Sequence, residues 1–306
     1  MAGPRVETSF VDWTVRPIRG YRAPAARAGS GPTPCFTKRK ALIHYMTSNG
    51  VGNAWVANEL RVVSRCEIPF VLHSLRPSDA RYFEAQDACD IDRRSRVLYP
   101  LPPLAFAASV AIAPAVFGRR FFSALWNALT GPRESFWIRL KCLGHLFVAC
   151  HWALGLRHEP VSLVHSQWIH SGGTVAMYGA WLLDVPFSFT GHAADLFRER
   201  AALRDKIAHA QFIVCISEFH RQFFLDEGAH PDQLFVAYCG VDVSHFRPKR
   251  VPGERAPGRV RLLASGRLVE KKGFADLISA CRLLADREVD FECVIAGSGP
   301  LEQDLR

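Results

Sequence analysis

The sequence predicts an α/β protein built from two doubly wound parallel sheets. Short apolar strands and longer amphipathic segments alternate along residues 161–238, which is typical of an open sheet with right-handed crossovers. A segment rich in proline, glycine and basic residues at 247–259 interrupts this alternation, which restarts at residue 261. The 306 residues are enough for two ordinary domains with a sizeable core.

The first domain is predicted over residues 38–248. It opens with a strand at 41–45, a loop, and an amphipathic stretch at 54–63, which together are the repeating piece of a parallel sheet. The elements that follow keep the same rhythm. We expect further strands at 69–74, 161–165, 186–190, 212–216 and 234–238, and further helices at 174–183, 203–209 and 219–227.

Residues 97–157 differ from the rest of this domain because they are apolar and largely helical. The stretch 101–117 is short for a membrane span and carries three prolines. We therefore expect helices that pack on the domain or lie in a membrane interface. Basic residues flank these helices and would suit an anionic leaflet, although a helix pair with solvated charges explains them equally well. They are Arg119, Arg120, Arg133, Arg139 and Lys141.

Three further segments complete the organisation. Residues 1–37 are rich in proline, glycine, alanine and arginine without a sustained period, and predict a disordered leader. Residues 249–259 predict an interdomain linker. Residues 260–306 predict a strand at 261–265, a helix at 274–284 and a strand at 291–296. Two strands and one helix are too few to bury both faces of a sheet, so we expect this second domain to be incomplete.

Composition narrows the function classes. The formal net charge of +9 suits nucleotide phosphates, polyphosphate-linked lipids or an anionic membrane, but no zinc-finger spacing or aromatic-basic repeat favours nucleic acid. The nine cysteines include no CxxC pair, which argues against a disulfide framework or a zinc site and favours a reducing cytoplasm.

The strongest candidate site is the loop from Gly266 to Gly273, between a predicted strand and the start of a predicted helix. Ligands of open α/β sheets bind at the carboxyl ends of the strands, and helix N-termini attract anions. Arg267 and Lys272 add two cations that could hold a diphosphate. A basic surface loop without function is the plainer alternative.

Weaker candidates follow other strands. His192 comes after the strand and Thr-Gly of Phe187–Gly191, where it could donate a hydrogen bond to a sugar hydroxyl, but a satisfied histidine at a strand end explains it as well. The glycines of the loop 48–53 would let backbone N–H groups approach a ligand. His165 and Gln167 end another strand, and Gly297-Ser-Gly299 is a phosphate or turn motif of low specificity.

In combination, these segments resemble the family 4 glycosyltransferases, retaining enzymes of the GT-B fold. The segment GRLVEKKGF, followed by CVIAGSGPLEQDL, is similar to the opening of that family's donor domain. HSQWIHSGGTVAMYGAWLLDVPFSFTGHAADLF, FIVCISEF and LFVAYCGVDVSHFRP are similar to the second half of its first domain. SLRPSDARYF and the apolar helices resemble the branch that builds exopolysaccharides such as colanic acid. The resemblance runs from about residue 40 to Arg306.

The resemblance implies two Rossmann-like domains facing a cleft, and it implies roles for individual residues. Arg267 and Lys272 would bind the donor diphosphate, and His192 would contact the transferred sugar. The family needs no metal, and the nucleotide sugar is a substrate rather than a cofactor. Lesser binding roles fall to Gly50, Gly52, Asn53, His165, Asp195, Glu218, Gly266, Gly297 and Gly299.

The sequence also departs from the family. The loop at 48–53 has neither common form, and His165-Ser-Gln167 replaces a usual His-x-His. The two glutamates, seven residues apart, that hold the donor sugar and ribose in the family's donor domain are missing here. We therefore expect a C-terminally truncated chain whose own activity is open.

Three functions remain open at this point. The leading one is retaining transfer of a sugar from a nucleotide donor to a glycan or lipid-linked hydroxyl, in the cytoplasm or at the inner face of the membrane. A nucleotide-sugar 2-epimerase would use the same scaffold, with Asp195 and Glu218 as its candidate carboxylates. A truncated, non-catalytic remnant is the third.

Overall fold

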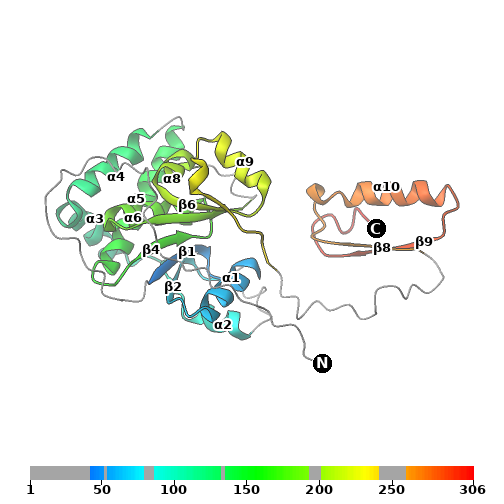
Figure 1. Ribbon diagram of the computed structural model, residues 1–306, viewed down its shortest axis with the longest axis horizontal. Coiled ribbons are helices and arrows are strands. Elements are labelled where there is room, and N and C mark those ends of the chain that lie inside the picture. The colour runs from blue at the N-terminus through cyan, green and yellow to red at the C-terminus, as the bar shows by residue number, and fades with distance from the viewer. Residues whose placement is uncertain (1–41, 52–53, 79–85, 132–134, 193–200, 241–259) are drawn as a thin grey trace, which may run out of the picture. The chain divides into compact units, whose positions relative to one another are not determined.

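The computed structural model describes residues 42–51, 54–78, 86–131, 135–192, 201–240 and 260–306 (Figure 1). The chain divides into two compact units, Met1–Val241 and Asp242–Arg306, called unit 1 and unit 2 below. The predicted leader at 1–37 and the predicted linker at 249–259 lie outside the described residues.

Unit 1 is organised around a seven-stranded parallel sheet with the strand order β3-β2-β1-β4-β5-β6-β7. Chain order therefore runs outward in both directions from β1 and β4, as a doubly wound sheet requires. Every strand pair is parallel, and β1 pairs with β4 so that Tyr45 lies opposite His165. The strands are β1 (Ile43–Asn49), β2 (Phe70–Arg76), β3 (Arg96–Val97), β4 (Leu163–Ser166), β5 (Phe187–Gly191), β6 (Ala210–Cys215) and β7 (Leu234–Val236).

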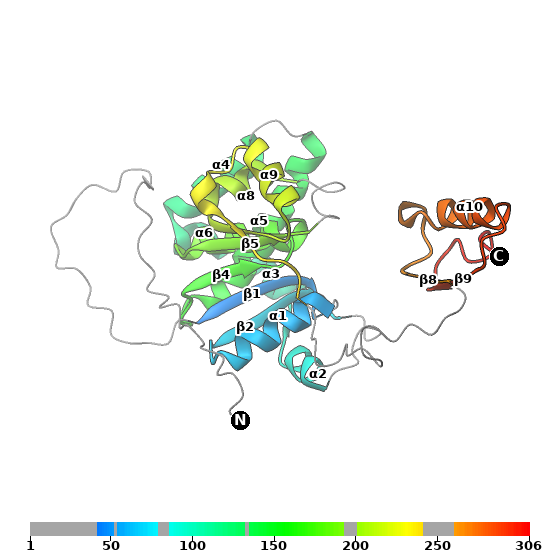
Figure 2. The same ribbon diagram turned by 45° about the vertical axis from the view of Figure 1, so that its right-hand side comes forward.

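Helices cover both faces of this sheet. Figure 2 shows α1 (Ala54–Arg65) and α2 (Gln86–Arg93) on one side, opposite α5 (Phe136–Leu156) and α6 (Ser171–Leu183). The main core lies on the α5 and α6 side, and a smaller apolar cluster lies under α1. The remaining elements of unit 1 are α3 (Pro103–Phe117), α4 (Arg119–Thr130), α8 (Leu203–His209), α9 (Glu218–Asp226) and the 3₁₀ turn η2 (Pro231–Gln233).

Local sequence explains several helix ends. The Ser135 hydroxyl accepts a hydrogen bond from the Ile138 amide at the start of α5, and the Ser217 hydroxyl accepts one from the His220 amide at the start of α9. Both serines act as N-caps, which satisfy amides that have no partner inside the helix. Asp184 ends α6 in the left-handed conformation, with φ of 61°.

The apolar segment is helical, as the sequence predicts; it forms the three helices α3, α4 and α5, and α3 and α4 pack against α5. Pro103 opens α3, and Pro114 lies inside it. Among the described helices, none has both the length and the hydropathy to cross a bilayer alone. The pair α3 and α4 meets that test together but is bent by 117° where the helices meet.

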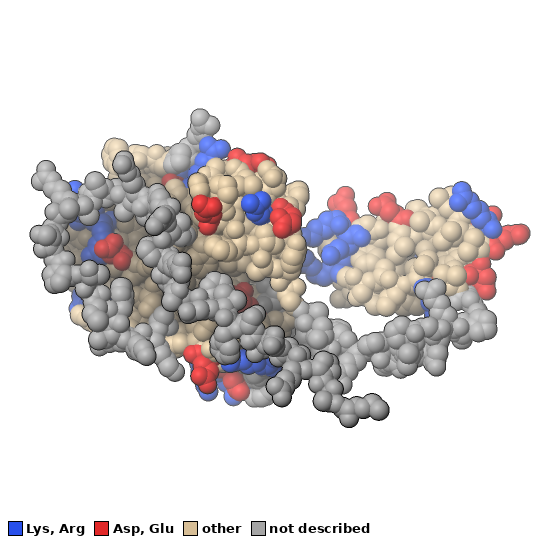
Figure 3. Space-filling view, viewed as in Figure 1, with Lys and Arg blue, Asp and Glu red and all other residues tan. Residues whose placement is uncertain are grey.

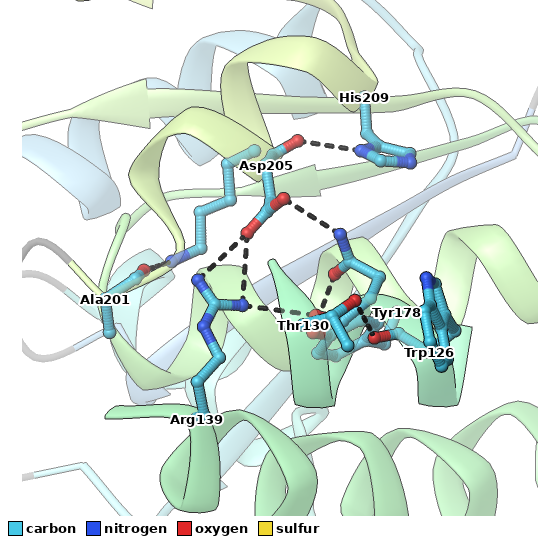
Figure 4. A network of polar contacts seen from close by, with 9 residues as sticks. Trp126, Thr130, Arg139, Tyr178, Ala201, Asp205 and His209 are labelled. Atoms are coloured by element: carbon cyan, nitrogen blue, oxygen red, sulfur yellow. Dashed lines mark hydrogen bonds and ion pairs between the residues drawn. The ribbon is translucent and has the colours of Figure 1, made fainter. Parts of the chain in front are cut away.

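Arg139 differs from the expectation that it flanks these helices as an exposed cation. Its side chain is buried, and its guanidinium forms an ion pair with the Asp205 carboxylate of α8 at 3.5 Å (Figure 4). It also donates a hydrogen bond to the Asn127 carbonyl at 3.2 Å. The sequence shows the charge of this residue but not the carboxylate, 66 residues away, that lies beside it.

Unit 2 contains a parallel pair of strands, β8 (Val260–Ser265) and β9 (Phe291–Ala296), with α10 (Phe274–Ala285) along one side (Figure 1). A 3₁₀ turn, η3 (Glu270–Lys272), precedes α10. Among residues 260–306, only Leu268 and Phe274 are buried.

The predicted strands and helices are found within a few residues of their expected positions, and the helix at 203–209 and the strand at 291–296 coincide with α8 and β9. Two elements, α2 and β3, were not predicted from the sequence. α2 carries four charged residues in eight, and β3 has only two residues, so neither produces an apolar periodicity.

Candidate functional site

The carboxyl edge of the unit 1 sheet gathers most of the predicted residues of that unit. Because β2 and β4 flank β1 on opposite sides, the strand order reverses there, and ligands of such sheets bind at that reversal. The segments that follow β1, β4, β5 and β6 all begin at this edge, since parallel strands share one direction.

Gly50 follows β1 and adopts a positive φ of 55°. A Cβ atom there would lie 2.5 Å from the Asp92 carboxylate and 2.7 Å from the Ser78 Cβ, so a larger residue does not fit. Its amide donates a hydrogen bond to the Ser74 hydroxyl rather than pointing to an open site. The structure therefore gives Gly50 a role in shaping the loop, while Gly52 and Asn53 lie outside the described residues.

His192 lies directly after β5 and is buried. Its ring stands 4.9 Å, centroid to centroid, from the indole of Trp168, which follows β4. Burial, and secondarily the charge of His220, lowers the pKa of His192 to about 4. At neutral pH its imidazole is therefore uncharged, and it can orient a hydroxyl through a hydrogen bond but does not act as a cation.

The start of α6 lies beside the end of β1, at the same carboxyl edge of the sheet. The Ser48 hydroxyl lies 3.2 Å from Nδ1 of His170, and the His170 ring is 5.4 Å from that of Trp168. A Cβ on Gly173 would lie 2.4 Å from the Trp168 carbonyl oxygen, so glycine allows this close approach.

His165 lies inside β4 and is buried, with Nδ1 2.8 Å from the Ser188 hydroxyl and Nε2 3.0 Å from the Thr190 hydroxyl. Burial lowers its pKa to about 3. These contacts engage both ring nitrogens within the sheet. The charge of His192 also contributes to the lowered pKa of His165, so His165 lies near His192 but is held inside the sheet.

Glu218 is the first residue of α9, at the carboxyl end of β6, and its side chain is exposed. An acidic residue in the first turn of a helix is stabilised by the helix dipole, which is a sufficient local reason for its position. Asp195 lies outside the described residues.

Sequence reasoning missed several residues of this edge. Trp168, His170 and His220 are grouped around His192 by the fold. In the sequence, Trp168 and His170 fall three and five residues after the predicted strand at 161–165, and His220 falls inside the predicted helix at 219–227. The aromatic side chains of these residues, and the position of Trp168 and His170 after a strand, were the sequence features that could have identified them as site residues.

A half-buried carboxylate, Glu59 of α1, was also missed. The Tyr45 hydroxyl donates a hydrogen bond to it at 3.5 Å, and burial raises the pKa of the carboxyl. The fully buried Gln167 amide lies beside Glu59 and opposes that rise in pKa. The sequence places Glu59 on the predicted amphipathic stretch at 54–63, three residues after Val56, which the structure shows to be buried. This position near the apolar side of the helix was the sequence feature that could have indicated a half-buried carboxylate.

In unit 2, the segments after β8 and β9 are hydrogen-bonded to each other. The Gly266 amide donates to the Ala296 carbonyl at 3.0 Å, and the Leu268 amide donates to the Ser298 carbonyl at 2.9 Å. A Cβ on Gly297 would lie 1.9 Å from the Gly266 oxygen, and one on Gly299 would lie 2.4 Å from the Leu268 oxygen. Both glycines therefore permit this close packing.

Arg267 and Lys272 are exposed beside this paired loop, at the carboxyl end of β8. Gly273 takes a φ of 66° and is the N-cap residue of the twelve-residue helix α10, so the loop leads into a helix N-terminus. Figure 3 shows Lys and Arg side chains gathered at the end of unit 2 where α10 begins. The arrangement places exposed cations beside a helix N-terminus, which is suited to an anion such as a diphosphate.

Among the residues that the structure describes, no group of three or more histidine, cysteine, aspartate or glutamate side chains could hold a metal ion.

Several solved structures, glycosyltransferases among them, resemble this chain in fold. A glycosyltransferase of Rickettsia africae is 13% identical, with a TM-score of 0.51 over 87% of this chain and 62% of its own. HepE of Anabaena, solved in complex with UDP and glucose, is 13% identical, with a TM-score of 0.51 over 87% of this chain and 63% of its own. At this identity the likeness concerns the fold alone.

The family model for Glycosyltransferase Family 4 matches residues 115–245, which include Trp168 and His192. This segment of the chain is therefore similar to glycosyltransferase family 4. WcaL of Escherichia coli, assigned as a colanic acid biosynthesis glycosyltransferase, is 37% identical over 26% of this chain and 19% of its own length. AmsK of Erwinia amylovora, an amylovoran biosynthesis glycosyltransferase, is 29% identical over 38% of this chain and 29% of its own length. The chain thus aligns with less than a third of these relatives.

Proposed function

We propose that this protein transfers a sugar from a nucleotide-sugar donor to a hydroxyl of a glycan or lipid-linked acceptor in polysaccharide biosynthesis, with retention of the anomeric configuration. The observation that carries the proposal is the family 4 match over the segment that holds the His192 edge of unit 1. Two relatives with assigned roles in exopolysaccharide synthesis, and a structural neighbour solved with UDP and glucose, support it.

In this proposal unit 2 is the donor side of a GT-B enzyme. The leaving nucleoside diphosphate gains negative charge as its bond to the sugar breaks. Arg267 and Lys272 meet that charge at the end of β8, so they favour the transition state more than the ground state. The helix amides of α10 add to this effect.

Unit 1 supplies the sugar and acceptor side. The neutral imidazole of His192 holds a sugar hydroxyl by a hydrogen bond, and it stays neutral because burial lowers its pKa to about 4. The Trp168 ring beside it fixes the plane of the imidazole, so that the hydrogen bond keeps one direction.

The donor side is tested by titration calorimetry with UDP and GDP. Arg267→Ala and Lys272→Ala should each weaken diphosphate binding about three- to tenfold, since exposed charge-assisted contacts are partly screened by water. Lys271→Ala is the matched control, because Lys271 is an exposed cation of the same 3₁₀ turn and should change binding little. Equal losses in all three variants would reduce the site to a general basic patch and contradict the assigned roles.

The sugar side is tested by following transfer or hydrolysis of a panel of nucleotide sugars, with the anomeric form of the first product read by proton NMR. His192→Gln should lower kcat by at least about tenfold, as expected for the loss of a transition-state contact. The exposed His158→Gln variant should match the wild type. An inverted product would overturn retention, and full activity of His192→Gln would remove His192 from the site.

A further inference from the structure

The outer layer of helices in unit 1 presents apolar side chains to solvent, where polar ones are expected. Trp126 and Trp137 are each 70% exposed, and Phe136 is 74% exposed. Other large apolar residues of the same helices are also exposed. They are Leu104, Ile112 and Val116 of α3, Phe122 and Leu129 of α4, and Leu140 of α5, and the nine residues together are called the apolar face below.

The apolar face follows from helical geometry. Phe122, Trp126 and Leu129 are spaced four and three residues apart, so they lie on one side of α4. The opposite side of α4 buries Phe121, Ala124 and Ala128 against the core. The exposed residues therefore form a second apolar side of α4, which does not pack against the core.

A buried polar network holds the corner between α4 and α5. The Asp205 carboxylate accepts a hydrogen bond from the Asn127 amide at 2.8 Å and pairs with Arg139 of α5 at 3.5 Å (Figure 4). The Tyr178 hydroxyl donates to the Asn127 side-chain oxygen at 3.0 Å. Because α4, α5, α6 and α8 meet in this network, the last turn of α4 and the first turn of α5 have a fixed relation. The aromatic residues on these two turns are thus carried by a rigid support.

The charges around the apolar face are all positive within the three helices. α3 carries no charged residue, and α4 and α5 carry no acidic one. Arg119 and Lys141 are exposed, whereas Arg120 lies 3.8 Å from the Asp184 carboxylate. Arg133 lies outside the described residues. A surface of aromatic and aliphatic side chains with basic residues beside it is complementary to a bilayer interface with anionic headgroups.

We propose that the apolar face docks unit 1 onto the surface of an anionic lipid bilayer, with the aromatic rings in the headgroup region and Arg119 and Lys141 against lipid phosphates. The helices lie on the membrane and do not cross it. A second copy of the chain fits less well, because a symmetric contact would bring the cations of both copies together without acidic partners from these helices. The inference does not depend on transfer activity.

The experiment is flotation of the full chain with vesicles of phosphatidylglycerol and phosphatidylethanolamine, compared with vesicles of phosphatidylcholine alone, at low salt. The protein should float with the anionic vesicles and bind the neutral ones much more weakly. Arg119→Glu/Lys141→Glu should weaken anionic binding by about 25-fold or more, from about fivefold per lost cation. Trp126→Ser/Trp137→Ser should weaken binding at least about tenfold.

The matched control is Phe219→Ser/Tyr238→Ser, which removes aromatic residues of similar exposure, 65% and 69%, from elsewhere in unit 1 and should bind like the wild type. A second readout uses the unaltered chain, because brominated lipids in the vesicles should quench its tryptophan fluorescence. Trp126→Phe/Trp137→Phe should lose most of this quenching while it still floats. The proposal would be overturned if the protein did not float with anionic vesicles, or if the control variant lost as much vesicle binding as the tryptophan variant. A dimer in solution that dissociates in the tryptophan variants would also overturn it.

Discussion

The two parallel sheets of this chain bury their strands to very different degrees. All five residues of β5 in unit 1 are buried, and helices cover both faces of that sheet. In unit 2, by contrast, Leu263 of β8 is 75% exposed and Val294 of β9 is 46% exposed. Unit 2 depends instead on a paired loop, in which Leu268 and Phe274 are buried next to two glycines.

This difference shows that the two units are stabilised in different ways. Unit 1 encloses titratable and charged side chains, including four histidines within or directly after its strands, so its stability depends on their protonation and pairing. Residues 260–306 contain no histidine and have few buried side chains, so their stability depends on backbone fit. Each unit should therefore lose its structure under a different perturbation.

The largest expected effect is acid sensitivity confined to unit 1. Burial lowers the pKa of His73 and His165 to about 3 and that of His192 to about 4. Below the ordinary pKa of 6.5 the unfolded chain binds protons that the folded chain does not, so stability is full above pH 6.5 and falls as the pH drops toward 4. Between pH 7.5 and 5 the three groups together should cost about 6 kcal/mol, from about 2 kcal/mol for each histidine.

Hydrogen exchange, corrected for its intrinsic pH dependence, should show faster global opening of peptides from β4 and β5 at pH 5. Peptides from β8 and β9 should change much less over this range. Equal loss of protection in both sheets would contradict the difference between the two units.

The next largest effect concerns the two ion pairs. The Arg139–Asp205 pair is buried, whereas the pair of Arg261 and Glu292, at 2.8 Å on unit 2, is exposed. Asp205→Ala should destabilise unit 1 by about 3–5 kcal/mol, because it leaves a buried guanidinium without the carboxylate that balances its charge. Glu292→Ala should change the stability of unit 2 by less than about 1 kcal/mol. Urea denaturation followed by hydrogen exchange reports each unit, and similar small effects would refute the assignment of Arg139 to the core.

A third prediction tests the dependence of unit 2 on backbone fit. Gly297→Ala should destabilise this unit by about 1–3 kcal/mol, because the new Cβ would lie 1.9 Å from the Gly266 oxygen, which is a backbone atom. Gly266→Ala is the matched control, since its Cβ would make an ordinary contact of 3.5 Å with the Phe274 ring. Thermal unfolding monitored by exchange in β8 and β9 should separate the two variants, and equal stabilities would show that the loop is not tightly paired.

The alternation of apolar strands with helices was enough to predict the α/β class and most elements of unit 1. The helix at 203–209, for example, was predicted with its observed ends because Leu203 and Ile207 face the core at helical spacing. α2 was missed because its fold depends on tertiary contact: its Asp92 carboxylate accepts from the Val51 amide at 3.0 Å. No local pattern encodes a partner 41 residues away.

The candidate site shows the same limit. Strand ends in the sequence were enough to select His192, Arg267 and Lys272, whose roles stay predictions. They could not reveal that the Ser74 hydroxyl engages the Gly50 amide, or that His165 pairs with Ser188 and Thr190. The direction of a side chain in a buried strand depends on register with its neighbours, and sequence periodicity alone does not determine register.

The smallest effect distinguishes two glycines in the helices of unit 1. Gly144 of α5 has no atom within 4 Å of the position where a Cβ would lie, so Gly144→Ala should stabilise the unit by about 0.5–1 kcal/mol through reduced entropy of the unfolded chain. Gly179 of α6 is the opposite case, because its Cβ would lie 2.4 Å from the Trp152 ring, and Gly179→Ala should destabilise. Denaturation midpoints should therefore move in opposite directions. If both variants lose stability, the surroundings of Gly144 on α5 are packed more tightly than the open space beside it indicates. The dense packing that distinguishes unit 1 from unit 2 would then reach the outer surface of α5.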